Sequence, residues 1–444
     1  MAVPSGGPTP AVYLHIGAPK SGTTYLQSML WDNAEALSEA GVLLPGDSFD
    51  AHVRATRDLR GLSREPDDPR PAWEGAWDEL AADVTDHFGD HVKEPAYRVA
   101  VISNEVLCAV DDEGAERAVR SLAPYEVHIV YSARDLAGLL PSEWQEYVKH
   151  RFHYDFDHWL HEVVDGPRGG GAAQWFWRVH DIPEVLGRWA RHVPPERVHV
   201  LTLPGPDAPR ERLWERFAAL VGVDPAVADP STARANASLS WTETELLRAV
   251  NAAVDESVPM WLYHRLVTDV LALKILPGRG EPGRVPLPLD RRAWAADKAR
   301  ELTGAIRSAG YDVVGDLAEL LPGQSPSERE PAGPSGFAPG QAELLDVAAH
   351  TILGLLDQVS VLTEELTELR RERSEQHETA LPKLMARHLS ERNQAVWKMR
   401  VGYWHLKERL KGIEPPPEPE PEADAGDDAA AGPGIVLSQR APVR

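Results

Sequence analysis

The stretch AVYLHIGAPKSGTT, residues 11–24, decides the fold class of this chain. Its first seven residues form a short apolar run that ends at Gly17, which is typical of a buried strand. The residues after Gly22 have the apolar spacing of a helix, and Gly41 is placed to close that helix. The sequence therefore predicts a strand, a glycine-containing turn and a helix in direct succession.

Three later runs share this apolar, β-branched character: residues 98–103 (RVAVIS), 126–133 (EVHIVYSA) and 197–203 (RVHVLTL). Helical patterns lie between them, for example at residues 114–122 and 184–192. Short strands that alternate with helices indicate an α/β protein, a three-layer α/β/α arrangement around a mostly parallel central sheet. In such sheets ligands bind beyond the carboxyl ends of the strands, so we expect the site there.

The turn GAPKSGTT between the first strand and its helix has the chemistry of an anion cradle. A helix N-terminus offers free backbone N–H groups and a partial positive charge, and a glycine lets the backbone approach a ligand closely. The residues predicted to hold a phosphate or phosphosulfate are Lys20, Ser21, Gly22, Thr23 and Thr24. The motif is not a Walker A loop, because its lysine precedes the glycine.

A second anion-binding pair is predicted after the strand at residues 126–133. Arg134 follows that strand directly, and Ser142 comes eight residues later, about two helical turns on. A guanidinium and a hydroxyl together suit a second phosphate group, since arginine matches phosphate geometry in bidentate fashion. Pro141, directly before the serine, is placed to shift the start of the helix.

The segment APKSGTTYLQ resembles the 5′-phosphosulfate loop of the PAPS-dependent sulfotransferases, in particular those of bacterial type. The resemblance implies a P-loop-like fold and 3′-phosphoadenosine 5′-phosphosulfate (PAPS) as cofactor. It implies that Lys20 contacts the bridging oxygen and that residues 20–24 hold the 5′-phosphate. By the same resemblance, Arg134 and Ser142 bind the 3′-phosphate.

The resemblance extends loosely over residues 12–323, and only the two phosphate motifs in it are specific. RANASLSW, residues 234–241, is similar to a segment of bacterial sulfotransferases, which would place Arg234 over the 3′-phosphate of the cofactor. The late Arg-Lys-Gly signature of the family is not recognisable in this sequence.

A transfer of this kind needs a positioned base near the sulfur, and without a metal the charge must be met by cations and N–H groups. Glu105, just beyond the strand at residues 98–103, occupies the place of the histidine base in cytosolic family members, where several relatives use a glutamate. His52 is the rival base. The alternatives are that Glu105 caps a helix or pairs with a cation and that His52 is a surface or supporting residue. His15, inside the first strand, is expected in the core.

The composition of the chain excludes some classes of binding partner. The formal net charge of −23 argues against a nucleic acid or an anionic membrane. The longest apolar runs are shorter than the roughly 20 residues of a spanning helix, so no transmembrane segment is expected, and the absence of a signal-peptide pattern predicts a cytoplasmic protein. The single cysteine, Cys108, excludes an intramolecular disulfide and is expected to be buried.

The chain is expected to have one catalytic domain and a helical extension. The predicted parts are a disordered N-terminus at 1–10, the sulfotransferase domain at 11–321 with a helical part at 241–310, a linker at 322–340, a helical extension at 341–412 and a disordered acidic tail at 413–444. Apolar residues at heptad spacing over 345–369 predict either a coiled coil, hence a homo-oligomer, or a helix that docks on its own catalytic domain.

The acceptor is less well determined. The aromatic and basic run at residues 144–159 suits a sugar or polyphenol site and equally suits ordinary amphipathic helices. We therefore expect a small-molecule or glycan acceptor, whose hydroxyl or amine belongs to a carbohydrate, a lipid or a secondary metabolite. The alternative functions are a P-loop-type small-molecule kinase and an inactive scaffold that assembles through its C-terminal helices.

Overall fold

The computed structural model describes residues 10–64, 67–89, 97–205, 207–232, 239–255, 257–277, 285, 287–322, 339–392, 398–399 and 401–403. The chain divides into two units, Met1–Leu355 and Leu356–Arg444. Every element that bears on the site belongs to the first unit. The predicted N-terminal disorder, most of the predicted linker and the acidic tail fall outside the described residues.

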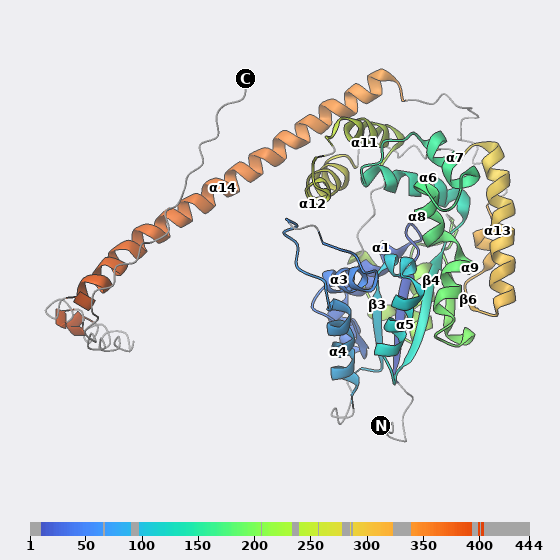
Figure 1. Cartoon of the computed structure of the whole chain (residues 1–444), viewed down its shortest axis with the longest axis horizontal. Coiled ribbons are helices and arrows are strands. Elements are labelled where there is room, and N and C mark those ends of the chain that lie inside the picture. Colours follow the sequence, from blue (N-terminus) through green and yellow to red (C-terminus); the bar gives the residue numbers. More distant parts are fainter. Residues whose placement is uncertain are drawn as a thin grey trace, which may run out of the picture. The chain divides into compact units, whose positions relative to one another are not determined.

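Within the described residues, six parallel strands form one sheet in the order β2-β3-β1-β4-β5-β6 (Figure 1). The strands are β1 (Ala11–Gly17), β2 (Val42–Leu43), β3 (Val99–Ser103), β4 (Glu126–Ala133), β5 (Val198–Thr202) and β6 (Asp312–Val314). The four predicted strands are confirmed nearly to the residue. The two that the sequence did not reveal, β2 and β6, are edge strands too short to give a pattern.

The central position of β1 fixes where a ligand can bind. β1 pairs with β3 on one side and with β4 on the other, so that His15 lies opposite both Ser103 and Val130. The chain runs from β1 to the edge strand β2, returns to β3 beside β1, and then crosses to β4 on the opposite side of β1. Such a reversal of strand order opens a crevice at the carboxyl ends of the strands, and the loops after β1, β3 and β4 emerge there.

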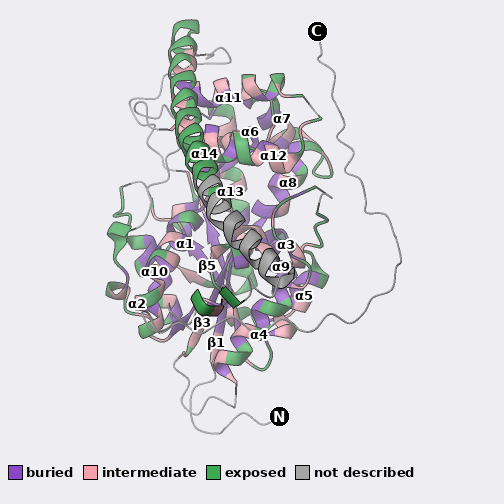
Figure 2. Cartoon of the chain, turned by 90° about the vertical axis from the view of Figure 1, so that its left-hand side faces the viewer, coloured by how far each residue is buried: buried purple, intermediate pink, exposed green. Residues whose placement is uncertain are grey.

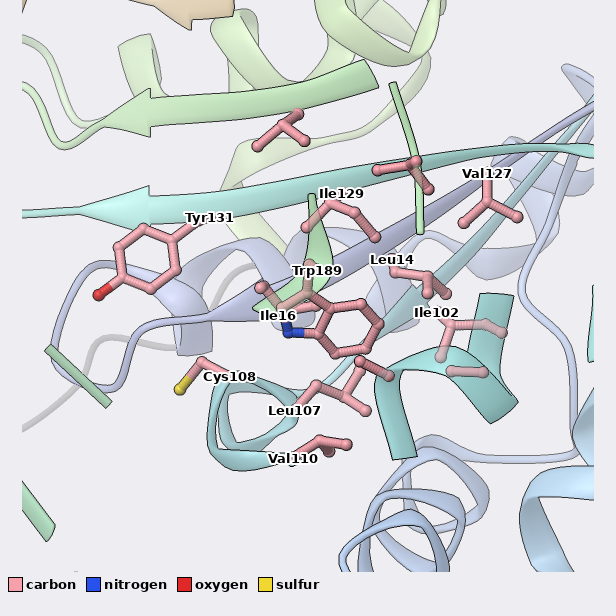
Figure 3. Packing of buried hydrophobic residues seen from close by; sticks show 14 of the residues in the cluster. Leu14, Ile16, Ile102, Leu107, Cys108, Val110, Val127, Ile129, Tyr131 and Trp189 are labelled. Atoms are coloured by element: carbon pink, nitrogen blue, oxygen red, sulfur yellow. The ribbon is translucent and has the colours of Figure 1, made fainter. Parts of the chain in front are cut away.

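Helices cover both faces of the sheet, because alternate strand residues point to opposite sides. Leu14 and Ile16 of β1 pack with Trp189 and Leu107 in one core, which Figure 3 shows. Tyr13, the residue before Leu14, belongs to the opposite core. The first core includes residues of α3 (Phe49–Leu59), α4 (Ala76–Phe88), α5 (Asp112–Ser121) and α9 (Ile182–Trp189), and the second includes residues of α1 (Thr23–Asp32), α2 (Ala34–Glu39) and α10 (Arg212–Val221). The arrangement is therefore α/β with helical layers on both faces.

The helix expected from the first turn to Gly41 is two helices, α1 and α2, which meet at Asn33. The side chain of Asn33 explains the break. Its amide donates to the carbonyl oxygen of Met29 at 3.0 Å, and its oxygen accepts from the backbone N–H of Asp229 at 2.8 Å. These contacts tie the interhelical junction to a remote segment, which no local pattern predicts.

A third core lies in a helical part beyond the sheet, where Trp144 and Trp159 are fully buried. Its helices are α6 (Leu136–Lys149), α7 (Phe156–Asp165), α8 (Gly171–His180), α11 (Trp241–Ala253), α12 (Met260–Tyr263), the π-helix η5 (His264–Ile275) and α13 (Leu289–Ala309). Short 3₁₀ segments complete the fold: η1 (Glu105–Ala109), η2 (Pro195–Arg197), η3 (Pro225–Val227), η4 (Pro230–Thr232) and η6 (Leu317–Leu320). The predicted helical stretch at 241–310 contains three of these helices and the π-helix.

The predicted C-terminal extension forms one long helix, α14 (Gln341–Arg392). Near its start Thr351 is buried and Gly354 packs against Ile275, whereas the apolar heptad residues from Ile352 onward are exposed, as Figure 2 shows for much of the helix. By length and composition alone, residues 341–371 could also cross a membrane, which the search for long apolar runs in the sequence did not reveal. Such a single helix is weak evidence for a membrane span, and a heptad repeat accounts for the same apolar residues.

Candidate active site

The loop after β1 is shaped by backbone conformations that favour glycine. Gly17 has a φ of +99°, and a Cβ atom there would lie 2.4 Å from the carbonyl oxygen of Glu105. Gly22 has a φ of +82° and precedes α1, which has no side-chain cap. The first N–H groups of α1 therefore lack both intrahelical partners and a capping side chain. An anion could accept hydrogen bonds from them and benefit from the helix dipole.

The hydroxyls of the loop divide into two groups. Ser21 is buried, and its hydroxyl donates to the carbonyl oxygen of Pro19 at 3.3 Å, so it holds the loop itself together. Thr23, Thr24 and Lys20 line a cavity. Of the predicted loop residues, these three face the space in which a ligand would react.

Lys20 has a partner that the sequence analysis missed. Its Nζ lies 2.6 Å from Oε2 of Glu146, and that carboxylate is also 3.3 Å from Nζ of Lys149. Burial by itself would lower the pKa of Lys20, but the charge of Glu146 outweighs it and the pKa is raised. Burial likewise opposes the charged form of Glu146, yet Lys20 holds its pKa well below the usual value. Glu146 lies four residues after Ser142, hence on the same face of α6, and that spacing could have identified it.

The predicted pair Arg134 and Ser142 is brought together, and it is joined to the first motif. Nη1 of Arg134 donates to the carbonyl oxygen of Lys20 at 3.1 Å and to Oγ of Ser142 at 3.3 Å. β4 ends at Ala133, so the arginine stands at the carboxyl edge of the sheet as predicted. Pro141 lies inside α6 and does not shift its start, which Asp135 caps through the N–H of Gly138 at 2.7 Å.

Glu105 stands at the wall of the same cavity as Lys20. It begins η1, directly after the edge of β3, and its Oε2 accepts a hydrogen bond from Nε2 of Gln27 at 2.7 Å. The capping alternative is wrong, because Asn104 caps η1 by accepting from the N–H of Val106 at 3.0 Å. Glu105 is thus a half-buried carboxylate that is oriented by a neutral amide and adjoins the anion loop.

His52 is not placed to act as a base. It is fully buried in α3, where Nε2 donates to the carbonyl oxygen of Pro45 at 2.9 Å and Nδ1 accepts from the backbone N–H of Ser103 at 3.2 Å. Both ring nitrogens are therefore engaged with the backbone, and burial lowers its pKa to about 4. The expectation of a rival base at this position is corrected: His52 connects α3 to β3. The expected core positions of His15 and Cys108 are confirmed.

The cavity has a volume of about 1140 Å³ and is bounded by the anion loop on one side and by α3, α6 and η5 on others. Its aromatic lining consists of Phe49, Tyr147, Phe152, Trp175 and Trp261. The aromatic run at residues 144–159 is thus divided in its roles: Tyr147, His150 and Phe152 line the cavity, whereas the two tryptophans of the run are core. The space is large enough for a small-molecule ligand.

Arg234, the remaining predicted contact to the cofactor, lies outside the described residues. Across the part of the chain that the structure describes, no group of three or more His, Cys, Asp or Glu side chains is arranged to hold a metal ion. No protein-family model, no curated protein and no solved structure matches the chain. The candidate site therefore stands on its own geometry.

Proposed function

We propose that the protein is a sulfotransferase that moves a sulfuryl group from PAPS to a hydroxyl or amine. The observation that carries the proposal is the position of Arg134, whose guanidinium joins Ser142 to the main chain of Lys20. Two motifs that the sequence predicts to bind anions thereby adjoin at one edge of the sheet. A cofactor with phosphate groups at both its 3′ and 5′ positions is a ligand that needs two such sites.

The residues of the loop suit the phosphosulfate end of that cofactor. The uncapped N-terminus of α1 offers N–H donors, and the positive φ at Gly22 bends the main chain there into the turn that presents them. Thr23 and Thr24 add hydroxyl donors, and Lys20 adds a full charge. When bound, PAPS supplies an activated sulfuryl group whose departure leaves a negative charge on the 5′-phosphate. Lys20 and the loop N–H groups are placed to stabilise that charge.

Glu105 is the proposed base. Its carboxylate shares the cavity wall with Lys20, and the amide of Gln27 holds one of its oxygens. It would accept the proton of the attacking hydroxyl or amine while the new bond to sulfur forms and the bond to the bridging oxygen breaks. Positioned charges can meet the electrostatic demands of this step, which resemble those of phosphoryl transfer.

The Lys20–Glu146 pair bears on how Lys20 would meet a ligand. A lysine that contacts the leaving oxygen must exchange the carboxylate of Glu146 for the ligand. Glu146 retains Lys149 at 3.3 Å and His150 at 3.4 Å, so its charge stays balanced after that exchange. The pair keeps Lys20 protonated and oriented toward the cavity.

A second proposal concerns α14. Its heptads carry Leu, Ile, Val and Leu in one core position and Ala, Leu, Leu and Leu in the other, a combination that favours parallel dimers. In a parallel pair Glu365 of one helix would face Arg370 of the other, a charge match between heptad flanks. We propose that the chain self-associates through these heptads.

The proposed function is tested by two calorimetric titrations of the purified protein. One uses 3′-phosphoadenosine 5′-phosphate without added metal, and the other uses ATP with magnesium. We expect the bisphosphate to bind and its affinity to fall at least about tenfold in Lys20→Ala and in Arg134→Ala, since each removes a charge-assisted contact. Arg120→Ala, which removes an exposed arginine paired with Glu116, is the matched control. Preference for magnesium-ATP would instead favour the kinase, and binding of neither would favour the scaffold.

A further inference from the structure

The cavity carries a second group of positive charges, on α3. Arg57 and Arg60 are three residues apart, hence on one face of the helix, and both line the cavity. Neither has a carboxylate within 4.0 Å among the residues that the structure describes, and both are half-buried. Arg54, on the same helix, differs from them: it pairs with Asp50 at 3.2 Å and is not part of the cavity wall.

Tryptophan rings hold the two side chains in place. Cζ of Arg57 lies 5.2 Å from the ring centroid of Trp73, and Cζ of Arg60 lies 5.0 Å from that of Trp175. A guanidinium that stacks on an aromatic ring uses its face for that contact and keeps its N–H edge for hydrogen bonds. The N–H edges of two guanidiniums one helical turn apart can donate hydrogen bonds to the same oxyanion.

Neither guanidinium is in direct contact with a described carboxylate, although the charges of Asp50 and Asp68 offset part of the charge of Arg57. Burial lowers the pKa of Arg57, and the neighbouring Arg70 lowers it further. Burial also lowers the pKa of Arg60, and Arg178 and Arg57 add to that effect. Arg70 itself is neutralised by Asp68 through a bidentate pair. The helix dipole interacts favourably with arginines near a helix C-terminus, which accounts for the position of Arg57 and Arg60 on α3. It does not explain why both side chains line a cavity and lack a described carboxylate in direct contact.

We propose that Arg57 and Arg60 bind an oxyanion carried by the acceptor, so that the acceptor is a hydroxyl or amine compound with a carboxylate, sulfate or phosphate group. The inference rests on the proposed function, because it makes this cavity the acceptor site. Phe49, Phe152 and Trp261 would surround the apolar body of such a molecule. Four carboxylates also line the cavity, so its wall has mixed charge, and the arginine pair is distinguished by the lack of a described carboxylate in direct contact with it. The carboxylates are those of Glu105, Glu143, Glu146 and Asp269.

The first experiment uses the full chain saturated with 3′-phosphoadenosine 5′-phosphate, which occupies the cofactor site and leaves the arginine pair open. Thermal unfolding is compared in sodium sulfate and in sodium chloride at equal ionic strength. We expect sulfate to raise Tm above the chloride value by about 2 °C or more in the wild type. That increment should shrink in Arg57→Gln/Arg60→Gln to the general stabilisation that sulfate gives any protein, and it should keep its wild-type size in Arg54→Gln, which removes a paired arginine from the same helix.

An equal sulfate increment in all three proteins, or none in the wild type, would overturn the proposal. Arg60→Gln alone serves if the double variant does not fold. If the bisphosphate does not bind at all, the proposed function fails, and the sulfate comparison in a Lys20→Ala background still tests the arginine pair by itself.

A second arm decides whether the anion belongs to the acceptor. Transfer of radioactive sulfate from PAPS is measured with acceptors in matched pairs, such as 4-hydroxyphenylacetate and its neutral amide. In Arg57→Gln/Arg60→Gln we expect the KM of charged acceptors to rise at least about tenfold and that of neutral acceptors to stay unchanged. Equal effects on both members, or transfer to neutral acceptors alone, would show that the arginines bind a free anion and would refute the acceptor assignment.

Discussion

The two walls of the cavity are built in different ways. On the sheet side, each candidate residue stands at the end of a strand: Lys20 after β1, Glu105 after β3 and Arg134 after β4. On the helical side, the lining residues are scattered along α3, α6 and η5, and no short motif contains them. The sheet side relies on backbone geometry to present donors, whereas the helical side relies on side-chain charge and aromatic surface.

This difference separates two kinds of role within the site. The strand ends are fixed by hydrogen-bonded neighbours, so a ligand bound there meets groups that are already in position. Side chains on the helical wall can be substituted without altering the sheet, which suits the part of a site that selects among substrates. Under the proposed function, the cofactor would bind at the first wall and the acceptor would be selected by the second.

The sharpest test compares Glu105, which lines the cavity, with His52, which is buried behind it in α3. Glu105→Gln should lower kcat by about 10² to 10⁴-fold, because a positioned proton acceptor is lost from the sheet edge. Binding of the bisphosphate and the free energy of unfolding should stay close to wild type. His52→Gln should leave kcat within a few-fold of wild type and lower the free energy of unfolding by about 2 kcal/mol, since it disturbs buried hydrogen bonds. The reverse result would return the role of base to His52.

His52 contributes to the pH dependence of stability, as do His15 and His128, whose pKa values burial also lowers to about 4. Burial lowers the pKa of His52 from 6.5 to about 4, so the unfolded chain takes up this proton first as pH falls. The free energy of unfolding is unaffected by this titration above pH 6.5. It falls by about 3 kcal/mol in total as pH drops from 6.5 to 4. When the free energy of unfolding is measured by urea denaturation at several pH values in this range, it should fall less steeply with decreasing pH in His52→Gln than in the wild type. An unchanged slope would mean that the histidine titrates normally in the folded protein.

A backbone test sharpens the comparison from the sheet side. Gly17→Ala should destabilise the fold by several kcal/mol, because a Cβ atom there meets the backbone of Glu105 at 2.4 Å and the φ of +99° is unfavourable. Gly61→Ala is the matched control: its φ is +60°, and nothing lies within 4 Å of the added Cβ. It should cost only the conformational term, about 1 kcal/mol. Equal losses in urea denaturation would show that the close approach of the two loops is unimportant.

The smallest effect on activity is expected from α14. Leu362→Asp places a charge in a heptad core position and should shift the chain from dimer to monomer in light scattering coupled to size exclusion. Leu353→Asp, an equally exposed leucine outside the heptad core, should leave the dimer intact. Neither substitution should change kcat more than about twofold, because the heptads lie outside the cavity wall. A monomer in all three proteins would refute self-association.

Much of the sheet side could be predicted from local patterns. The four longer strands have apolar runs of their own, and Arg134 and Ser142 are held eight residues apart by one strand end and one helix. The rest required contacts between distant segments. Glu146 meets Lys20 across more than a hundred residues, and Gln27 orients Glu105 from α1. His52 was misjudged because a histidine on an amphipathic helix gives no sign of which side is buried.

The sequence by itself determined the class of the fold, the strand–turn–helix at residues 11–32 and the position of Arg134 eight residues before Ser142, because strand periodicity, glycine and short spacings act over a few residues. Only the tertiary structure decided which residues share the cavity, since that depends on the order β2-β3-β1-β4-β5-β6 and on how α3 and η5 face the loop. It also decided that His52 faces the protein interior while Arg57, five residues later, faces the cavity. Burial and charge pairing arise between segments that the chain brings together only on folding.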